Sequence, residues 1–221
     1  MNLKIIAFVE GLNDTIFMEE VFRRMKPLRI EKVDISDLFS MVRNIMYEEE
    51  DMALITEYAG IGLSRALTLQ ARLCSHLLRV KDAFRYNKFS TLMLLDANHA
   101  LDNKVGRINE TIYKHITRFI TLSPSYKRRY ALSFTLTNKS LNVSVTASFV
   151  FVECSLECEI ARKIYKQYDI FCNTYACHRL LDQLDKDTRL SKVRELAILL
   201  ENQHNEEWYR NLRHLLTMVM K

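Results

Sequence analysis

The sequence has few glycines and prolines, and it contains no long apolar run. Only 4 glycines and 2 prolines occur in 221 residues, which argues against long flexible or proline-rich linkers. A membrane-spanning helix needs about 20 apolar residues, and no apolar run approaches that length. The apolar run at residues 5–9 is too short for the core of a signal peptide and is followed by Glu10. We therefore expect a cytoplasmic protein that does not associate with a membrane.

The residues that are abundant suit a folded domain with a full core. Apolar residues make up 48% and charged residues 27% of the chain, as is typical of globular proteins. The length allows one large domain, or one domain with a smaller attachment. The formal net charge of +5 permits contact with a polyanion but does not require one.

The five cysteines leave two interpretations open. An odd number without a secretory signal argues against a disulfide framework. Cys154 with Cys158, followed by Cys172 with Cys177, could form a zinc site, although neither pair has the C-x-x-C spacing of common zinc motifs. Burial of the cysteines as small hydrophobic residues on helices is the more frequent situation.

Hydrophobic periodicity predicts strands that alternate with helices. Short apolar runs indicate strands at residues 3–9, 28–36, 52–58 and 90–98. Helical spacing of apolar residues indicates helices at 15–25, 37–50, 63–81 and 107–122. The segments 129–137 and 141–152 flank Asn138-Lys139-Ser140, which predicts an antiparallel hairpin. Residues 155–221 are expected to be helical throughout, in two to four pieces.

This alternation indicates an α/β fold with a mostly parallel central sheet flanked by helices. The hairpin would make the sheet mixed. We expect an α/β domain over residues 1–154 and a helical C-terminal extension over residues 155–221 that packs on it. The extension would either cover the sheet or form a small appended unit.

Three of the apolar strands end in acidic residues, namely Glu10, Asp96 and Glu153. Ligands of open α/β sheets bind at the carboxyl ends of the strands. If the strands at 3–9 and 90–98 are neighbours, Glu10 and Asp96 lie on one rim and repel each other unless a cation lies between them. Mg²⁺ prefers such oxygen ligands, completed by waters and substrate phosphates. Each acid alone is explained by a strand that reaches solvent, and Asp14 by a helix N-cap, so the combination carries the metal hypothesis.

Two of these strand ends resemble the motifs of the Toprim domain family. "IIAFVEGLND" is similar to the first motif, a hydrophobic strand that ends in Glu-Gly. "TLMLLDAN" is similar to the second motif, a hydrophobic strand that ends in Asp-x-Asp. The added Asp14 is most similar to OLD-type nucleases and small archaeal Toprim-like proteins. The resemblance covers residues 1–160, and these two motifs carry it.

The resemblance implies a Mg²⁺ or Mn²⁺ site and phosphodiester chemistry on nucleic acid. By this resemblance, Glu10 would be the general acid/base or a metal ligand, Asp96 a metal ligand, and Asp14 the extra acid of nuclease-type members. The second acid of Asp-x-Asp is Asn98 here, which offers an amide oxygen without charge. Asp102 could compensate from the following loop.

Further residues are assigned less directly. Either Glu153 or Glu157, in "VECSLECEI", would correspond to a later acidic position of the family. Arg107 follows the Asp96 strand at the head of a predicted helix and could reach a phosphate at the same rim.

A basic cluster of Lys127, Arg128 and Arg129 lies between Tyr126 and Tyr130. Basic residues with aromatic neighbours can bind a phosphate backbone and stack bases. A solvated loop that leads into a strand explains the same residues.

The leading hypothesis is a divalent-metal-dependent nucleic-acid phosphodiester enzyme, most simply a nuclease, with Glu10, Asp14, Asp96 and Asn98 at the metal. A water held by the metal would attack phosphorus, and Glu10 would manage the proton. The alternative is a catalytically inactive Toprim-like module that binds nucleic acid or a protein, for which Asn98 is the main argument. A third hypothesis treats residues 155–221 as a dimerisation or scaffolding element for which the α/β part is the platform, so the sequence is compatible with a homodimer.

Overall fold

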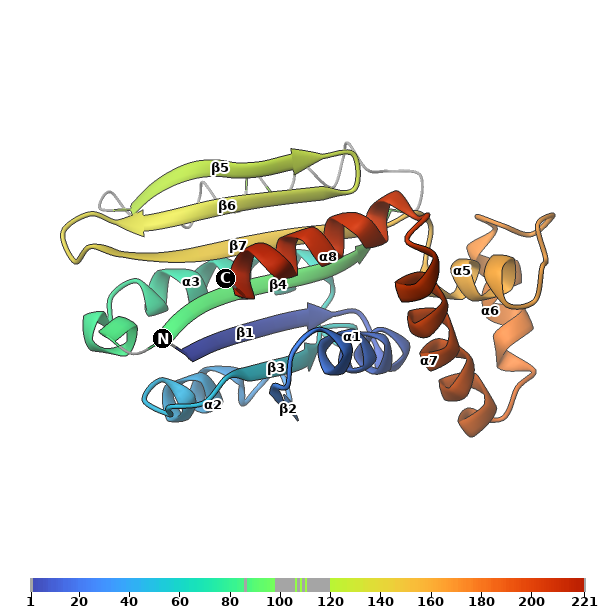
Figure 1. Ribbon diagram of the computed structural model, residues 1–221, viewed down its shortest axis with the longest axis horizontal. Coiled ribbons are helices and arrows are strands. Elements are labelled where there is room, and N and C mark those ends of the chain that lie inside the picture. The colour runs from blue at the N-terminus through green and yellow to red at the C-terminus, as the bar shows by residue number, and fades with distance from the viewer. Residues whose placement is uncertain are drawn as a thin grey trace.

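The computed structural model describes residues 2–85, 87–97 and 120–220, together with positions 106, 108 and 110. The predicted α/β class is confirmed (Figure 1). The strands are β1 (Asn2–Val9), β2 (Arg29–Lys32), β3 (Met52–Glu57), β4 (Asn87–Asp96), β5 (Ile120–Arg128), β6 (Ala131–Asn138) and β7 (Val143–Val152). The helices are α1 (Leu12–Met25), α2 (Leu38–Ile45), α3 (Leu63–Leu77), α5 (Leu156–Lys163), α6 (Thr174–Asp182), α7 (Lys186–Gln203) and α8 (Glu207–Met220). A short 3₁₀ helix spans Lys81–Arg85.

The strands form a seven-stranded sheet in the order β2-β3-β1-β4-β7-β6-β5. The pairs from β2 to β7 are parallel, whereas β6 pairs antiparallel with both β7 and β5. The predicted hairpin across residues 138–140 is therefore confirmed. Because β1, β4 and β7 are parallel neighbours, their carboxyl ends lie at one edge of the sheet.

Helices cover both faces of this sheet. In Figure 1, α8 crosses in front of the sheet, where it contacts β7 and β6, and α3 lies behind it in contact with β4 and β7. The helices α5, α6 and α7 lie beyond the carboxyl ends of β1 and β4, at the right of the view. The extension thus does both things that the sequence left open, because α8 covers the sheet and the other three helices stand at its edge.

The extension shares its hydrophobic core with the α/β part. One cluster of buried residues runs from the sheet through α1 into α7 and α8. The Trp208 ring lies 5.8 Å from the ring of Phe17 on α1, measured between centroids. Packing of this kind removes apolar surface from water on both elements at once. Helix α8 is therefore held to the body by this shared core.

The segment around residue 120 differs from the expectation. Residues 120–122, predicted at the end of a helix, begin the edge strand β5 instead. Strand β5 contains Pro124, next to a register shift between Pro124 and Tyr126. Proline lacks the N–H that a central strand needs, so an edge position with an irregularity suits it. Residues 127 and 128, expected in a loop, belong to the same strand.

One disulfide departs from the expectation against a disulfide framework. Cys154, after β7, is bonded to Cys172, before α6, and the two Cα atoms are 5.3 Å apart. The bond ties the end of β7 to the loop between α5 and α6, so that α5 lies within the closed segment.

Within the described ranges, the structure has no helix that is both long and apolar enough to cross a membrane.

Candidate functional site

Glu10 lies at the edge of the sheet because β1 ends there. The backbone of the next strand holds this end in place, with the Tyr58 N–H donating to the Val9 carbonyl (2.8 Å) and the Ala59 N–H donating to the Glu10 carbonyl (2.9 Å). Gly11 then caps α1, and its N–H donates to Asp14 Oδ2 (3.0 Å). Asp14 is therefore not the N-cap residue that the sequence suggests, because it lies in the first turn of α1. One oxygen of its carboxylate is engaged by the N-cap residue Gly11.

Asp96 ends β4, which pairs directly with β1 in the register Phe8↔Met93. The Ala97 N–H donates to the Val152 carbonyl (2.8 Å), so the chain after Asp96 is held by β7. Glu10 and Asp96 are consequently on one rim of the sheet, as the sequence predicts for neighbouring strands.

The two acids line a cavity of about 470 Å³. Asp14 lines it from α1, so the structure brings together three of the four predicted metal ligands. The far wall comes from the extension and consists of Glu157, His178, Asp182, Leu184, Lys186, Arg189 and Leu190. The cavity volume lies in the range of about 300–1,000 Å³ that is usual for small-ligand sites.

Glu157, and not Glu153, is the later acid that reaches this cavity. Glu157 lies in the first turn of α5. Its Oε1 accepts a hydrogen bond from Asn13 Nδ2 (2.6 Å). Glu153 is directed elsewhere, where its Oε1 accepts from the Tyr130 hydroxyl (3.0 Å). Of the two acids that the sequence left as alternatives, only Glu157 therefore lines the cavity.

Arg189 joins the two walls of the cavity. Its Nε donates to Asn13 Oδ1 (3.2 Å), and its Nη1 donates to Asp182 Oδ1 (3.0 Å). Its Nη2 lies 3.8 Å from Glu157 Oε1. Asn13, which is 8% exposed, thereby bridges a carboxylate and a guanidinium. The arrangement fixes α7 against the start of α1.

The charges of the cavity are unbalanced. Five carboxylates line it (Glu10, Asp14, Asp96, Glu157 and Asp182), against the cations of Lys186 and Arg189. Burial, with the charges of Glu157 and Glu10, raises the pKa of Asp14 to about 8. Burial also raises the pKa of Tyr58 above its usual range, and Glu10, Asp14 and Asp96 add to that rise. Carboxylates that repel in this way are stabilised by a proton or by a cation.

The donor set of the cavity fits a hard divalent cation such as Mg²⁺ or Mn²⁺, because the ligands are carboxylate oxygens. Within the described ranges, the oxygens of Glu10, Asp14 and Asp96 do not all lie within 4.8 Å of one another. An ion here would therefore take one or two carboxylates and fill its shell with water and phosphate oxygens, as Mg²⁺ commonly does.

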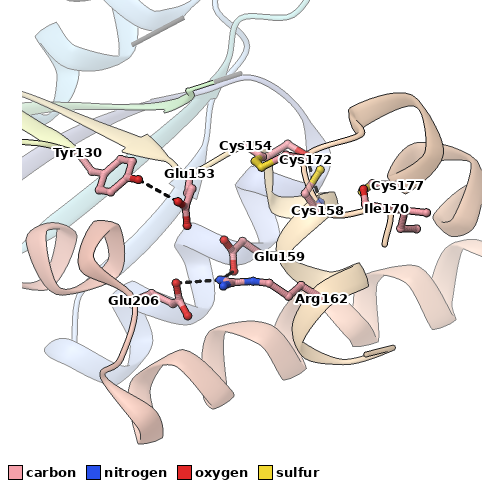
Figure 2. Close-up of a disulfide and its surroundings, with 11 residues drawn as sticks. Tyr130, Glu153, Cys154, Cys158, Glu159, Arg162, Ile170, Cys172, Cys177 and Glu206 are labelled. Atoms are coloured by element: carbon pink, nitrogen blue, oxygen red, sulfur yellow. Dashed lines mark hydrogen bonds and ion pairs between the residues drawn. A yellow bond between two sulfur atoms is a disulfide. The ribbon is translucent and has the colours of Figure 1, made fainter. Parts of the chain in front are cut away.

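A closer acidic cluster lies at Glu153, Glu159 and Glu206, whose carboxylate oxygens are within 4.8 Å of one another (Figure 2). Arg162 Nη2 lies 2.6 Å from Glu159 and 2.8 Å from Glu206. Lys163 also pairs with Glu206. Burial raises the pKa of Glu159 to about 7, although Arg162 opposes the rise. Because Arg162 and Lys163 already pair with two of these acids and the Tyr130 hydroxyl donates to the third, we interpret the cluster as a polar network that joins α5 to the start of α8.

The predicted nucleic-acid residues are placed in part. Lys127 and Arg128 end β5 and Arg129 follows in the turn to β6, all three exposed. Ala131 pairs with Val150, so this turn lies at the same sheet edge as Asp96. Three strand spacings separate β5 from β4, which corresponds to about 14 Å.

The aromatic part of that prediction is wrong for Tyr130, which is 6% exposed and hydrogen-bonded to Glu153. The Arg129 guanidinium lies over its ring, with Cζ 5.1 Å from the ring centroid, on a face where a base was expected to stack. Asn98, Asp102 and Arg107, together with the side chain of Tyr126, lie outside the described residues.

Several cavity residues are absent from the sequence prediction. Asn13 lies within the quoted motif "IIAFVEGLND", although no site role was predicted for it. His178, Asp182, Lys186 and Arg189 carry no local motif and are more than 160 residues away from Glu10. The mild helical periodicity of residues 155–221 does not reveal which face turns to the sheet.

The chain was compared with protein-family models, curated protein sequences and solved structures, and none of the three comparisons found a match.

Proposed function

We propose that this protein is a divalent-metal-dependent enzyme that acts on phosphodiester bonds of nucleic acid, most simply a nuclease. One observation carries the proposal. Glu10 and Asp14 come from the junction of β1 and α1, Asp96 comes from the end of β4, and all three line a single cavity at the carboxyl edge of the parallel strands. This is the place where open α/β sheets bind their ligands.

In this proposal Glu10 and Asp96 hold the Mg²⁺ or Mn²⁺, and Asp14 contributes once it has lost its proton. When bound, the cation would supply charge neutralisation at phosphorus and lower the pKa of a coordinated water. Glu10, at the carboxyl end of β1, lines the cavity and is suited to receive a proton as general base. The resemblance of "FVEGLND" and "LMLLDAN" to Toprim motifs agrees with these roles.

The basic residues supply the complementary substrate contacts. Lys186 and Arg189 face the acids across the cavity, where a substrate phosphate would lie between them and the cation. The turn with Lys127, Arg128 and Arg129 lies along the same edge and would bind a neighbouring phosphate of the same strand. Such contacts add affinity that falls as the salt concentration rises.

A second candidate is a Toprim-like module that binds without cleaving. It is favoured by Asn98, which stands where the second acid of Asp-x-Asp is expected and brings no charge. An enzyme and an inactive module differ in turnover, so one set of measurements distinguishes them.

The test is calorimetric titration of Mn²⁺ and Mg²⁺ into the wild-type protein and a double variant, Glu10→Gln with Asp96→Asn. The matched control is Glu49→Gln with Asp82→Asn, which removes the same charges from exposed residues that precede β3 and β4, at the opposite edge of the sheet. We expect binding by the wild type and the control, and loss of binding in the cavity variant.

Cleavage is then assayed with single- and double-stranded DNA and RNA in the presence of Mn²⁺. Metal-dependent cleavage that the cavity variant lacks supports the enzyme. Metal and nucleic-acid binding without cleavage supports the inactive module. Equal metal affinity in the wild type and the cavity variant overturns both, because the acids would then form no metal site.

A further inference from the structure

Four of the five cysteines gather between the end of β7 and the start of α6, behind the wall of the cavity. Cys154, Cys158 and Cys177 are at most 2% exposed and form one buried cluster, against which Cys172 packs. Figure 2 shows all four in one small region, with Cys154 and Cys172 joined as a disulfide. The Cys177 thiol donates to the Ile170 carbonyl (3.3 Å) in the same region. The sulfur atoms therefore converge from four separate positions.

The four cysteines occupy similar positions at two helix N-termini. Ser155 caps α5 by accepting a hydrogen bond from the Cys158 N–H (3.2 Å), and Asn173 caps α6 by accepting one from the Ala176 N–H (3.1 Å). One cysteine directly precedes each cap, and another follows within the first turns of the helix. The starts of the two helices thus bring their cysteines into one small region.

We propose that the reduced chain binds one Zn²⁺ through Cys154, Cys158, Cys172 and Cys177. Zinc in structural sites is tetrahedral and is commonly held by four cysteine sulfurs. Reduction of the Cys154–Cys172 disulfide by a thiol reductant takes up two electrons and two protons and yields two thiols. Binding of one Zn²⁺ to the four thiols then releases four protons. The disulfide and the zinc site are alternative states of the same sulfur atoms.

This site would organise the cavity wall without taking part in its chemistry. Glu157 precedes Cys158 and His178 follows Cys177, and both of these neighbours line the cavity. The Arg162 guanidinium lies over the ring of Phe171, beside Cys172, with Cζ 4.4 Å from the ring centroid. This contact links the same loop to α5. A cross-link between the starts of α5 and α6, through zinc or through the disulfide, therefore fixes the position of Glu157 relative to His178 in the cavity wall. The inference does not depend on the proposed nuclease activity.

The test measures zinc in protein purified with a thiol reductant and in protein with the disulfide intact. We expect one zinc per chain in the reduced protein and none in the oxidised protein, by elemental analysis. Cys158→Ser and Cys177→Ser are expected to lose zinc to a metal buffer that the wild type withstands. The matched control is Cys74→Ser, since Cys74 is a buried free cysteine of α3, distant in the fold and bound to Thr91. This control is expected to retain zinc.

Cobalt substitution of the wild type provides a readout that needs no variant. Co²⁺ held by four thiolates gives intense sulfur-to-metal charge-transfer bands and the visible bands of tetrahedral cobalt. Absence of zinc from the reduced wild type overturns the proposal, as does a cobalt spectrum without thiolate bands. Equal zinc loss in Cys74→Ser overturns it too. A second disulfide, between Cys158 and Cys177, formed in preference to metal binding would likewise contradict the site.

Discussion

Asp14 connects the charge of the cavity to the pH dependence of stability. Burial, with the charges of Glu157 and Glu10, raises its pKa to about 8. An aspartate in an unfolded chain has a pKa of about 4. Between these two values the native state binds the proton and the unfolded state does not, so stability falls as pH rises from about 4 to about 8. A bound cation would reverse this penalty by pairing with the carboxylate.

We therefore expect Asp14→Asn to stabilise the protein at pH 9 in the presence of a chelator. The amide oxygen can still accept the hydrogen bond from the Gly11 N–H. The substitution also removes the unfavourable ionisation of the buried carboxyl. The melting temperature should rise by several degrees, since 1 kcal/mol corresponds to about 2–4 °C in a chain of this size. The gain should be smaller at pH 5, where native Asp14 is already protonated. The same variant should bind Mn²⁺ more weakly than the wild type.

Thermal scans at the two pH values check this, with Asp169→Asn as the control because Asp169 is fully outside the cavity and exposed. A melting temperature of Asp14→Asn that is unchanged or lower at pH 9 would show that the buried charge does not destabilise the native state.

Single residues also show which parts of the site could be predicted from the sequence. Glu10 and Asp96 were predictable because each ends an apolar strand, and parallel neighbours place such ends together. Arg189 and Asn13 were not, because their contact depends on how α7 packs against α1. Glu153 and Glu157 looked equivalent in the sequence, yet the start of α5 directs them to different surroundings.

At the scale of elements, Asn13 links three helices through two hydrogen bonds. Its amide donates to Glu157 on α5 and accepts from Arg189 on α7, while its backbone belongs to α1. Removing it leaves a buried carboxylate and a guanidinium each short of a partner. Such unsatisfied groups cost about 1–3 kcal/mol.

Asn13→Ala should accordingly lower the free energy of unfolding by about 1–3 kcal/mol in urea titrations. The control is Asn205→Ala, an exposed loop amide whose loss should change stability by less than about 0.5 kcal/mol. Equal effects of the two changes would mean that the bridge contributes nothing to the docking of α7.

Strands and helices with strong periodicity were predictable, whereas the edge strand β5 was not. Its sequence contains Pro124 and several small polar residues, which weaken the alternation that marks a half-buried strand. The strand order was not predictable either, because β1 pairs with β3 and β4 and not with β2, which follows it in the sequence. The adjacency of β1 and β4 was therefore predicted only as a condition. The position of α5, α6 and α7 at the sheet edge followed from tertiary packing alone.

At the scale of the whole molecule, the buried cluster that joins the sheet to α8 predicts cooperative unfolding. The single tryptophan, Trp208, lies on α8 against Phe17 of α1, so its fluorescence reports on the extension. Far-ultraviolet circular dichroism reports on all helices and strands. If the extension and the α/β part share one core, the two signals should change at the same urea concentration, as in a two-state transition.

Phe17→Ala sharpens this prediction, because Phe17 is fully buried between the body and α8. The loss of a buried phenylalanine side chain costs about 3–5 kcal/mol, so both transitions should shift together to lower urea. Ile198→Ala, on the exposed side of α7, is the control and should shift neither by much. A fluorescence transition that moves alone, while the circular dichroism transition stays in place, would show that α8 detaches as a separate unit. In that case the packing of α8 on the body would not be what holds α6 and α7 at the cavity.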